Sequence, residues 1–152
     1  MGLNTFLAAL LVYRHNLQIL HWMANGESFL TIHEQAQKYY ELLTKDIDTV
    51  AEMYLRYSNT IVNYKEAYEL IEHSDHAFLV VSGNDFCDME AFTTFSGQMF
   101  NDLKYCIETL LTDQEEFESI KAVGVKSELE NMHNEYDLQA NYILKRLSTE
   151  KK

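Results

Sequence analysis

The chain has 152 residues, about the length of one domain, and 47% of them are hydrophobic, which is enough to enclose a core. Its 24 acidic residues outnumber its 12 basic ones, giving a formal net charge of −12. This balance disfavours binding to DNA phosphates, which depends on Lys and Arg, and favours cations instead. The sequence has no proline and only five glycines, so long helices are expected and the fold class is predicted to be all-α.

The first helix is expected over residues 4–25. Asn4 is placed to cap its start, and Asn25-Gly26 would end it, because both residue types tolerate a positive φ angle. Apolar residues recur along it at alternating spacings of four and three, the seam of a bundle helix. They are Phe6, Leu10, Tyr13, Leu17, Leu20 and Ala24.

The second helix is expected to run from a cap at Ser28 to about Tyr57, a rod of about 45 Å. His33 lies beside its apolar stripe. The stripe consists of Phe29, Ile32, Ala36, Tyr40, Leu43, Ile47, Val50 and Tyr54.

A break follows over residues 59–84, with a short helix around Tyr64 to His73. A third long helix is predicted over 88–112 and a fourth over 127–147. Their inward residues are expected to be Phe92, Phe95, Met99, Leu103, Cys106 and Leu110, then Leu129, Met132, Tyr136, Ala140, Ile143 and Leu147. Four long helices with one long connection predict a single ferritin-like four-helix bundle domain over residues 1–152.

The stretch from His21 to Glu52 concentrates residue types that bind metals. His21 and His33 stand twelve residues apart, and Asp48 and Glu52 follow fifteen and nineteen residues after His33. A set of nitrogen and carboxylate ligands suits iron or zinc. We therefore predict a metal site, against the alternative of half-buried histidines with satisfied hydrogen bonds and a solvated acidic face.

One chain cannot bring these four side chains to a single ion. On a continuous helix His33 and Asp48 are about 22 Å apart, although they point only about 60° apart around it. Two copies packed antiparallel about a twofold axis would place His33 of one chain near Asp48 and Glu52 of the other, with His21 completing the cluster. The metal prediction therefore requires a homo-oligomer.

The same stretch resembles the Dps family, the miniferritins. Its first signature is matched by His21, Trp22, Gly26, Phe29, Ile32 and His33, and its second by Asp48, Ala51 and Glu52. The resemblance implies a dodecameric hollow shell that stores iron. It also implies a ferroxidase centre between twofold-related subunits, at which hydrogen peroxide or oxygen oxidises Fe(II), and a short helix between the second and third long helices. The four ligands would be His21, His33, Asp48 and Glu52, and Trp22 would intercept radicals beside them.

Three features depart from the pattern of that family. Gln37 stands where an acidic residue is usual, one turn after the second histidine, and Met53 replaces the Arg that usually follows Ala-Glu. The Gly- and Pro-containing loop that usually follows this helix is absent. Gln37 removes a negative charge from the predicted site, whereas Met53 and the altered loop bear on the assembly contacts.

Two other functions are compatible with the sequence. A di-metal site inside one bundle needs a Glu-x-x-His motif on each of two helices, and Glu130 with His133 supplies only one. A non-enzymatic helical interaction or structural protein would keep the fold and lose or weaken the metal site. A second cluster of possible ligands is expected to be solvated surface; it consists of Glu72, His73, Asp75 and His76. The acidic turn at 113–118 is also expected to be solvated, and the alternative for it is an electronegative entrance for iron in an assembly.

The sequence shows no secretory signal and no apolar run of about 18 residues, so a cytoplasmic protein without a membrane span is expected. In such a reducing compartment the two cysteines, Cys87 and Cys106, are expected to be free thiols in the core. DNA-condensing members of the family usually carry a Lys-rich tail. Here only Lys145, Arg146, Lys151 and Lys152 lie near the C-terminus, so DNA binding is not expected.

Overall fold

The computed structural model describes residues 2–73, 83, 85–112 and 123–148. Several sequence features fall outside these ranges, so their predicted roles stay predictions. They are Asp75, His76, the acidic turn at 113–118, Lys151 and Lys152.

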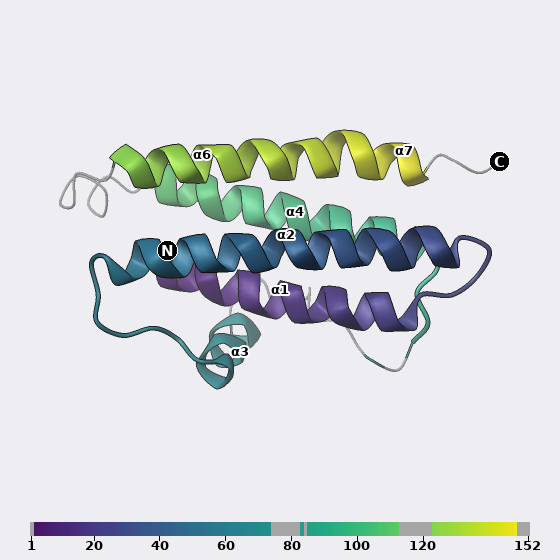
Figure 1. Ribbon diagram of the computed structural model, residues 1–152, viewed down its shortest axis with the longest axis horizontal. Helices are drawn as coiled ribbons and strands as arrows, with labels where there is room; N and C mark the ends of the chain where they lie inside the picture. The colour runs from purple at the N-terminus through teal and green to yellow at the C-terminus, as the bar shows by residue number, and fades with distance from the viewer. Residues whose placement is uncertain (1, 74–82, 84, 113–122, 149–152) are drawn as a thin grey trace.

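Four long helical rods lie side by side, as Figure 1 shows. They are α1 (Leu3–Met23), α2 (Phe29–Leu55), α4 (Met89–Thr112) and a last rod made of α6 (Val123–Leu138), η2 (Gln139–Ile143) and α7 (Leu144–Ser148). The connection from α2 to α4 carries a short helix, α3 (Tyr64–Glu72), which packs against α1. The predicted all-α ferritin-like bundle, with a short helix in its long connection, is confirmed.

The apolar seam of α1 is buried as predicted, whereas that of α2 differs at adjacent positions. Tyr39 and Met53 are buried, and Tyr40 and Tyr54 are only partly buried. Adjacent helix positions point about 100° apart, so a small rotation of the helix exchanges them. Tyr39 takes the inner place because its hydroxyl donates to Gln139 Oε1 at 2.8 Å.

A π-helical turn changes the register of the last rod. The backbone N–H of Leu144 donates to the carbonyl of Gln139, five residues earlier. A π turn contains one residue more than an α turn, so the inward face shifts by one position after it. Leu144 is consequently buried, and the predicted inward residues Ile143 and Leu147 are only partly buried.

The helix starts show where local sequence signals failed. The prediction that Asn4 caps α1 is wrong, because Gly2 is the N-cap and its carbonyl already accepts from Thr5 and Phe6. Asn4 therefore lies inside the helix, where its side chain cannot reach the free N–H groups. Ser28 is the N-cap residue of α2 but makes no side-chain capping bond.

Two tyrosine–aspartate pairs, one buried and one partly buried, join the halves of the bundle. The hydroxyl of Tyr13 on α1 donates to Asp102 on α4 at 2.6 Å, and that of Tyr136 on α6 donates to Asp46 on α2 at 2.5 Å. Burial raises the pKa of Asp46, and Glu135 adds to this, while the bond from Tyr136 partly opposes it. Each pair satisfies polar groups that would otherwise be costly to bury.

The two cysteines are free and buried, as predicted. Burial raises the pKa of the Cys87 thiol to about 11. The backbone of Cys87 also ties the start of α4 to the α1–α2 turn, since its N–H donates to the carbonyl of Met23 at 2.8 Å. Among the described helices, none combines the length and the apolar character needed to cross a membrane.

Candidate metal centre

His21 and His33 meet where α1 turns into α2. Gly26 allows this sharp reversal, because its φ of 96° is a backbone conformation that other residues rarely adopt. The two imidazole rings stack with their centroids 3.8 Å apart and their planes inclined by 22°. Both side chains are half-buried, so the structure brings together the two predicted nitrogen ligands of one chain.

Each histidine is held by the backbone of the other. Nδ1 of His21 lies 2.8 Å from the carbonyl oxygen of His33, and Nδ1 of His33 lies 3.0 Å from that of His21. A carbonyl oxygen only accepts, so both Nδ1 atoms must donate and carry the proton. In the neutral ring, each Nε2 then has a free lone pair, the arrangement that fixes a metal-binding histidine in the correct tautomer.

The stacking decides how these lone pairs can be used. The lone pair of Nε2 lies in the plane of its ring, and the two planes are nearly parallel. Both lone pairs cannot converge on one ion at the usual distance of about 2.1 Å unless a ring turns and breaks its carbonyl bond. The pair therefore offers two neighbouring ligand positions, one at His21 and one at His33.

Asp48 and Glu52 lie far from the histidines of their own chain. α2 is continuous from His33 to both carboxylates, which puts them about 22 Å and 28 Å along its axis. Both side chains are exposed. Within the described residues, no three His, Cys, Asp or Glu side chains are close enough to hold a metal ion. In a single chain the four predicted ligands thus form two separate groups.

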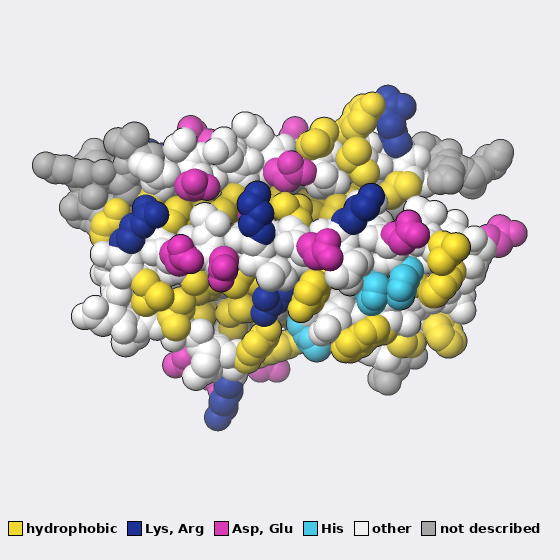
Figure 2. Space-filling view, viewed as in Figure 1, with side chains coloured by type: hydrophobic (Ala, Val, Ile, Leu, Met, Phe, Trp, Pro, Cys, Tyr) yellow, Lys and Arg dark blue, Asp and Glu magenta, His cyan; other side chains and the backbone are white. Residues whose placement is uncertain are grey.

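Three large apolar side chains in the same stretch as the histidine pair are exposed at the surface. Trp22 is 62% exposed, Phe29 40% and Leu30 66%. The ring centroid of Phe29 lies 5.3 Å from that of His33. Figure 2 shows two adjacent histidine side chains bordered by hydrophobic ones toward this end of the bundle. Exposed apolar groups around a polar site are typical of a surface that another protein covers.

Gln37 and Glu41 form a contact that the sequence analysis did not single out. The Gln37 amide Nε2 donates to a carboxylate oxygen of Glu41 at 3.0 Å. The two residues are four positions apart on α2, a spacing at which helix side chains meet, and this spacing was the available signal. Gln37 itself lies one turn after His33.

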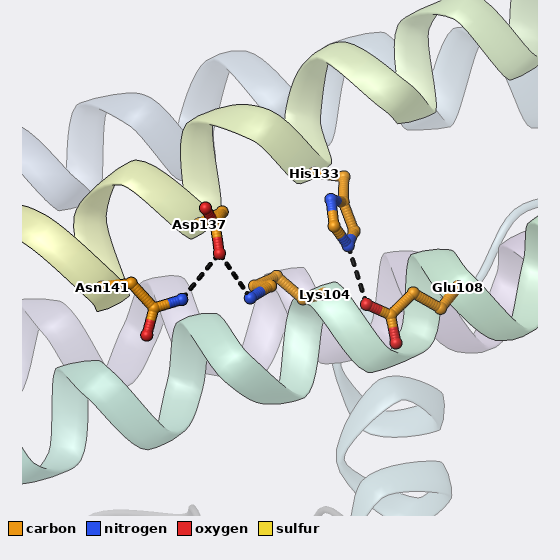
Figure 3. A network of polar contacts seen from close by, with 5 residues as sticks. All are labelled: Lys104, Glu108, His133, Asp137 and Asn141. Carbon is orange, nitrogen blue, oxygen red and sulfur yellow. Dashed lines mark hydrogen bonds and ion pairs between the residues drawn. The ribbon is translucent and has the colours of Figure 1, made fainter.

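The other candidate clusters are not built as metal sites. His133 of the Glu-x-x-His motif points across the α4–α6 seam, where its Nε2 lies 2.8 Å from Glu108 (Figure 3). Glu130 is exposed beside an open cavity of about 530 Å³, outside the bundle core. The described part of the second cluster, Glu72 and His73, is exposed as expected of solvated surface.

The fold, together with the paired histidines at one end of it, is that of a ferritin-like four-helix-bundle protein. Among curated proteins, the chain is similar to the DNA protection during starvation protein of Porphyromonas gingivalis, with 39% identity over 80 residues. The match covers 46% of this chain and 50% of the relative, so the chain spans about half the length of the curated relative it matches. This confirms the resemblance to Dps in a divergent form. No family model matches the chain, and no solved structure does.

Proposed function

We propose that the protein is a divergent miniferritin that binds Fe(II), oxidises it with hydrogen peroxide or oxygen, and stores or detoxifies the ferric product. The ligands are His21 and His33 of one subunit and Asp48 and Glu52 of its twofold neighbour. The observation that carries this proposal is the pair of reciprocal bonds from Nδ1 to the backbone, which leaves both Nε2 lone pairs free.

The ligand set suits the change in charge during the reaction. Two Fe(II) ions each lose one electron, and one hydrogen peroxide molecule accepts both electrons as its O–O bond breaks to give two hydroxide ions. Two carboxylates from the neighbour stabilise the increase from +2 to +3, which neutral imidazoles alone do not. Zn²⁺ suits the same ligands without redox chemistry, which makes it a probe of binding.

Trp22 is the proposed catalytic partner of this centre. It follows His21 directly in the sequence and exposes 62% of its surface. In this role its indole gives an electron to radicals that escape from peroxide reduction, which protects the ligands. This role comes from the family resemblance.

The proposed assembly is a homo-oligomer, and a dodecamer by analogy with the family. The exposed apolar side chains around the histidines support burial against a second subunit. The name of the relative refers to DNA protection. For this chain we propose protection through removal of iron and peroxide without DNA binding, because a net charge of −12 repels phosphates.

Complementation between subunits tests the shared centre. A His33→Ala chain and an Asp48→Asn/Glu52→Gln chain are each expected to lose iron oxidation while keeping the wild-type oligomer mass. When the two are mixed and reassembled, a heterologous pair has one site with intact histidine and intact carboxylates, so activity returns in part. If the wild type oxidises iron but oligomers shown to contain both variant chains do not regain activity, a centre shared between two subunits is excluded.

The alternative is a ferritin-like interaction or structural protein without oxidase activity, which the neutral side chain of Gln37 favours. Met53 does not favour it, because it is buried in the core of its own chain and not placed at an assembly contact. A wild-type oligomer that neither oxidises Fe(II) nor binds Zn²⁺ would establish this alternative.

A further inference from the structure

We propose that Asn25 and Gly26, in the turn between α1 and α2, form a site of spontaneous modification, at which the Asn25 side-chain amide is converted to a carboxylate. The conversion alters the backbone of the turn that joins His21 to His33. Asparagine is a thermolabile residue, and no other asparagine of this sequence is followed by glycine. The modification follows from the local chemistry alone, whereas its effect on metal binding rests on the proposed metal site.

The reaction needs no reagent other than water. The backbone nitrogen of Gly26 attacks Cγ of Asn25 and closes a five-membered succinimide ring. The proton of that nitrogen leaves with the side-chain NH2 group as ammonia. Water then opens the ring at one of its two carbonyl groups. One opening gives aspartate, and the other gives isoaspartate, in which the main chain runs through Cβ and is longer by one carbon atom.

The peptide unit between Asn25 and Gly26 can rotate for this attack. Within the described part of the chain, neither its N–H nor its carbonyl makes a hydrogen bond, and neither does the Asn25 side chain. The groups on either side are held, since the Asn25 N–H donates to the carbonyl of Cys87 at 2.9 Å and the N–H of Phe29 donates to the Gly26 carbonyl at 3.1 Å. Rotation of this one peptide unit therefore breaks no hydrogen bond.

Gly26 also leaves room around the attacking nitrogen. Glycine has no side chain to shield that atom, and a Cβ placed at Gly26 would meet no atom within 4 Å. Both Asn25 and Gly26 are exposed to water. Asn101 and Asn134 are exposed as well, but they lie inside α4 and α6, where the N–H of the next residue is bonded within the helix. Exposure alone therefore does not make an asparagine of this chain reactive.

The isoaspartate lengthens a turn whose two ends are tied together. Only residues 24–28 lie between α1 and α2. Across them, Nδ1 of His21 lies 2.8 Å from the carbonyl oxygen of His33, and Nδ1 of His33 lies 3.0 Å from that of His21. An added main-chain carbon moves one helix end relative to the other, so both bonds cannot keep these lengths. Because the two bonds fix the tautomer and the orientation of the rings, the conversion weakens the histidine pair as a metal site.

The test compares fresh protein with protein aged at mildly alkaline pH, where the Gly26 nitrogen loses its proton more readily. Peptide mapping by mass spectrometry follows the conversion, with Asn101 and Asn134 as internal controls, and enzymatic methylation detects isoaspartate. Zinc binding to the intact oligomers is measured by calorimetry. The variant Asn25→Gln keeps an amide but must close a larger ring, and fresh Asn25→Asp carries the charge without the added carbon.

We expect Asn25 to convert at least about 10-fold faster than Asn101 or Asn134, with isoaspartate among the products. Aged wild type should bind zinc at least about 10-fold more weakly than fresh wild type, whereas aged Asn25→Gln and fresh Asn25→Asp should match the fresh protein. Hydrogen exchange in the α1–α2 turn should also be faster after ageing, which reports the same change without metal.

The possible failures are distinguishable. Conversion of Asn25 no faster than that of the helical asparagines would overturn the modification site and leave the proposed function intact. Conversion without a change in hydrogen exchange or zinc affinity would overturn its effect on the histidine pair. If fresh wild type bound no more zinc than a His21→Ala/His33→Ala variant, the proposed function would fail, while mass and hydrogen exchange would still decide the inference.

Discussion

The histidines of the two helical hairpins are used in opposite ways. In the α1–α2 hairpin, His21 and His33 donate through Nδ1 to backbone carbonyls and keep Nε2 free. In the α4–α6 hairpin, Nε2 of His133 is already occupied by the carboxylate of Glu108 at 2.8 Å. A histidine held by a neutral carbonyl remains available to a metal ion, whereas one bonded to a carboxylate is satisfied within its own chain.

The side chains around the histidines also differ between the two hairpins. Figure 3 shows that His133 belongs to a row of polar contacts along the seam. Lys104 Nζ lies 2.7 Å from Asp137, and the Asn141 amide donates to the same carboxylate oxygen at 2.6 Å. These bonds, that of Lys104 first, lower the pKa of Asp137. Near His21 and His33, by contrast, Trp22, Phe29 and Leu30 expose large apolar side chains, and the ring of Phe29 lies 5.3 Å from that of His33.

The largest expected effect is on iron oxidation, which should depend on His21 and not on His133. His21→Ala should reduce Fe(II) oxidation by at least about 100-fold, because loss of a second-shell partner alone costs about 10- to 100-fold in metal sites. His133→Ala should leave the rate unchanged. The measurement is the rate of ferric product formation after Fe(II) and peroxide are added to oligomers of equal mass. Equal losses in the two variants would contradict the comparison.

The second prediction compares the two tyrosine–aspartate pairs that join the α1–α2 hairpin to the α4–α6 hairpin. Tyr136→Phe leaves the carboxylate of Asp46, which is only 4% exposed, without its donor, and should lower the free energy of unfolding by about 3 kcal/mol. Tyr13→Phe should cost about 1 kcal/mol, because Asp102 is partly exposed to water. Urea unfolding of both variants measures the difference. Similar losses would mean that burial does not set the cost.

The fold could be predicted from the sequence wherever apolar spacing decided it. The seam of α1 and most of that of α2 are buried at the predicted residues, because helical periodicity and burial obey the same geometry. The π turn at Gln139–Ile143 could not be predicted in this way. It depends on tertiary contacts such as the bond from Tyr39 to Gln139, which the local pattern does not contain.

The candidate site was predictable in its residue types and not in its hydrogen bonds. His21 was expected to complete a cluster with His33, and the structure stacks the two imidazole rings where α1 turns into α2. The reciprocal carbonyl bonds and the stacking of the rings depend on side-chain rotamers, which spacing does not define. The role of Glu130 and His133 was equally undefined until the position of Glu108 across the seam was known.

The third prediction is the pH dependence of the Asp46 contribution. Burial raises the pKa of Asp46 above its unfolded value near 3.8, so the folded state binds the proton more tightly. The stability that this group contributes is therefore complete below pH 3.8 and falls as pH rises through the folded pKa. Each unit of that rise corresponds to about 1.4 kcal/mol.

Asp46→Asn keeps an acceptor for Tyr136 and removes the titration. The measured quantity is the free energy of unfolding of the wild type minus that of the variant, obtained by urea unfolding at several pH values. This difference should decrease as the pH is raised from 4 to 7. Other carboxylates cancel in this difference. A constant difference over the whole range would show that the pKa of Asp46 is the same in the folded and unfolded states.

The smallest expected effect belongs to the surface pair of the α4–α6 seam. The side chain of Glu108 is 56% exposed, so water and salt screen its attraction to His133. Glu108→Gln should therefore lower the free energy of unfolding by less than about 1 kcal/mol, and by still less at high salt. It should leave iron oxidation and zinc stoichiometry unchanged, because His133 belongs to a structural tie between two helices. If the variant lost oxidation or tightly bound zinc while remaining folded, the α4–α6 pair would be part of a metal site, and the distinction between the two kinds of histidine would fail.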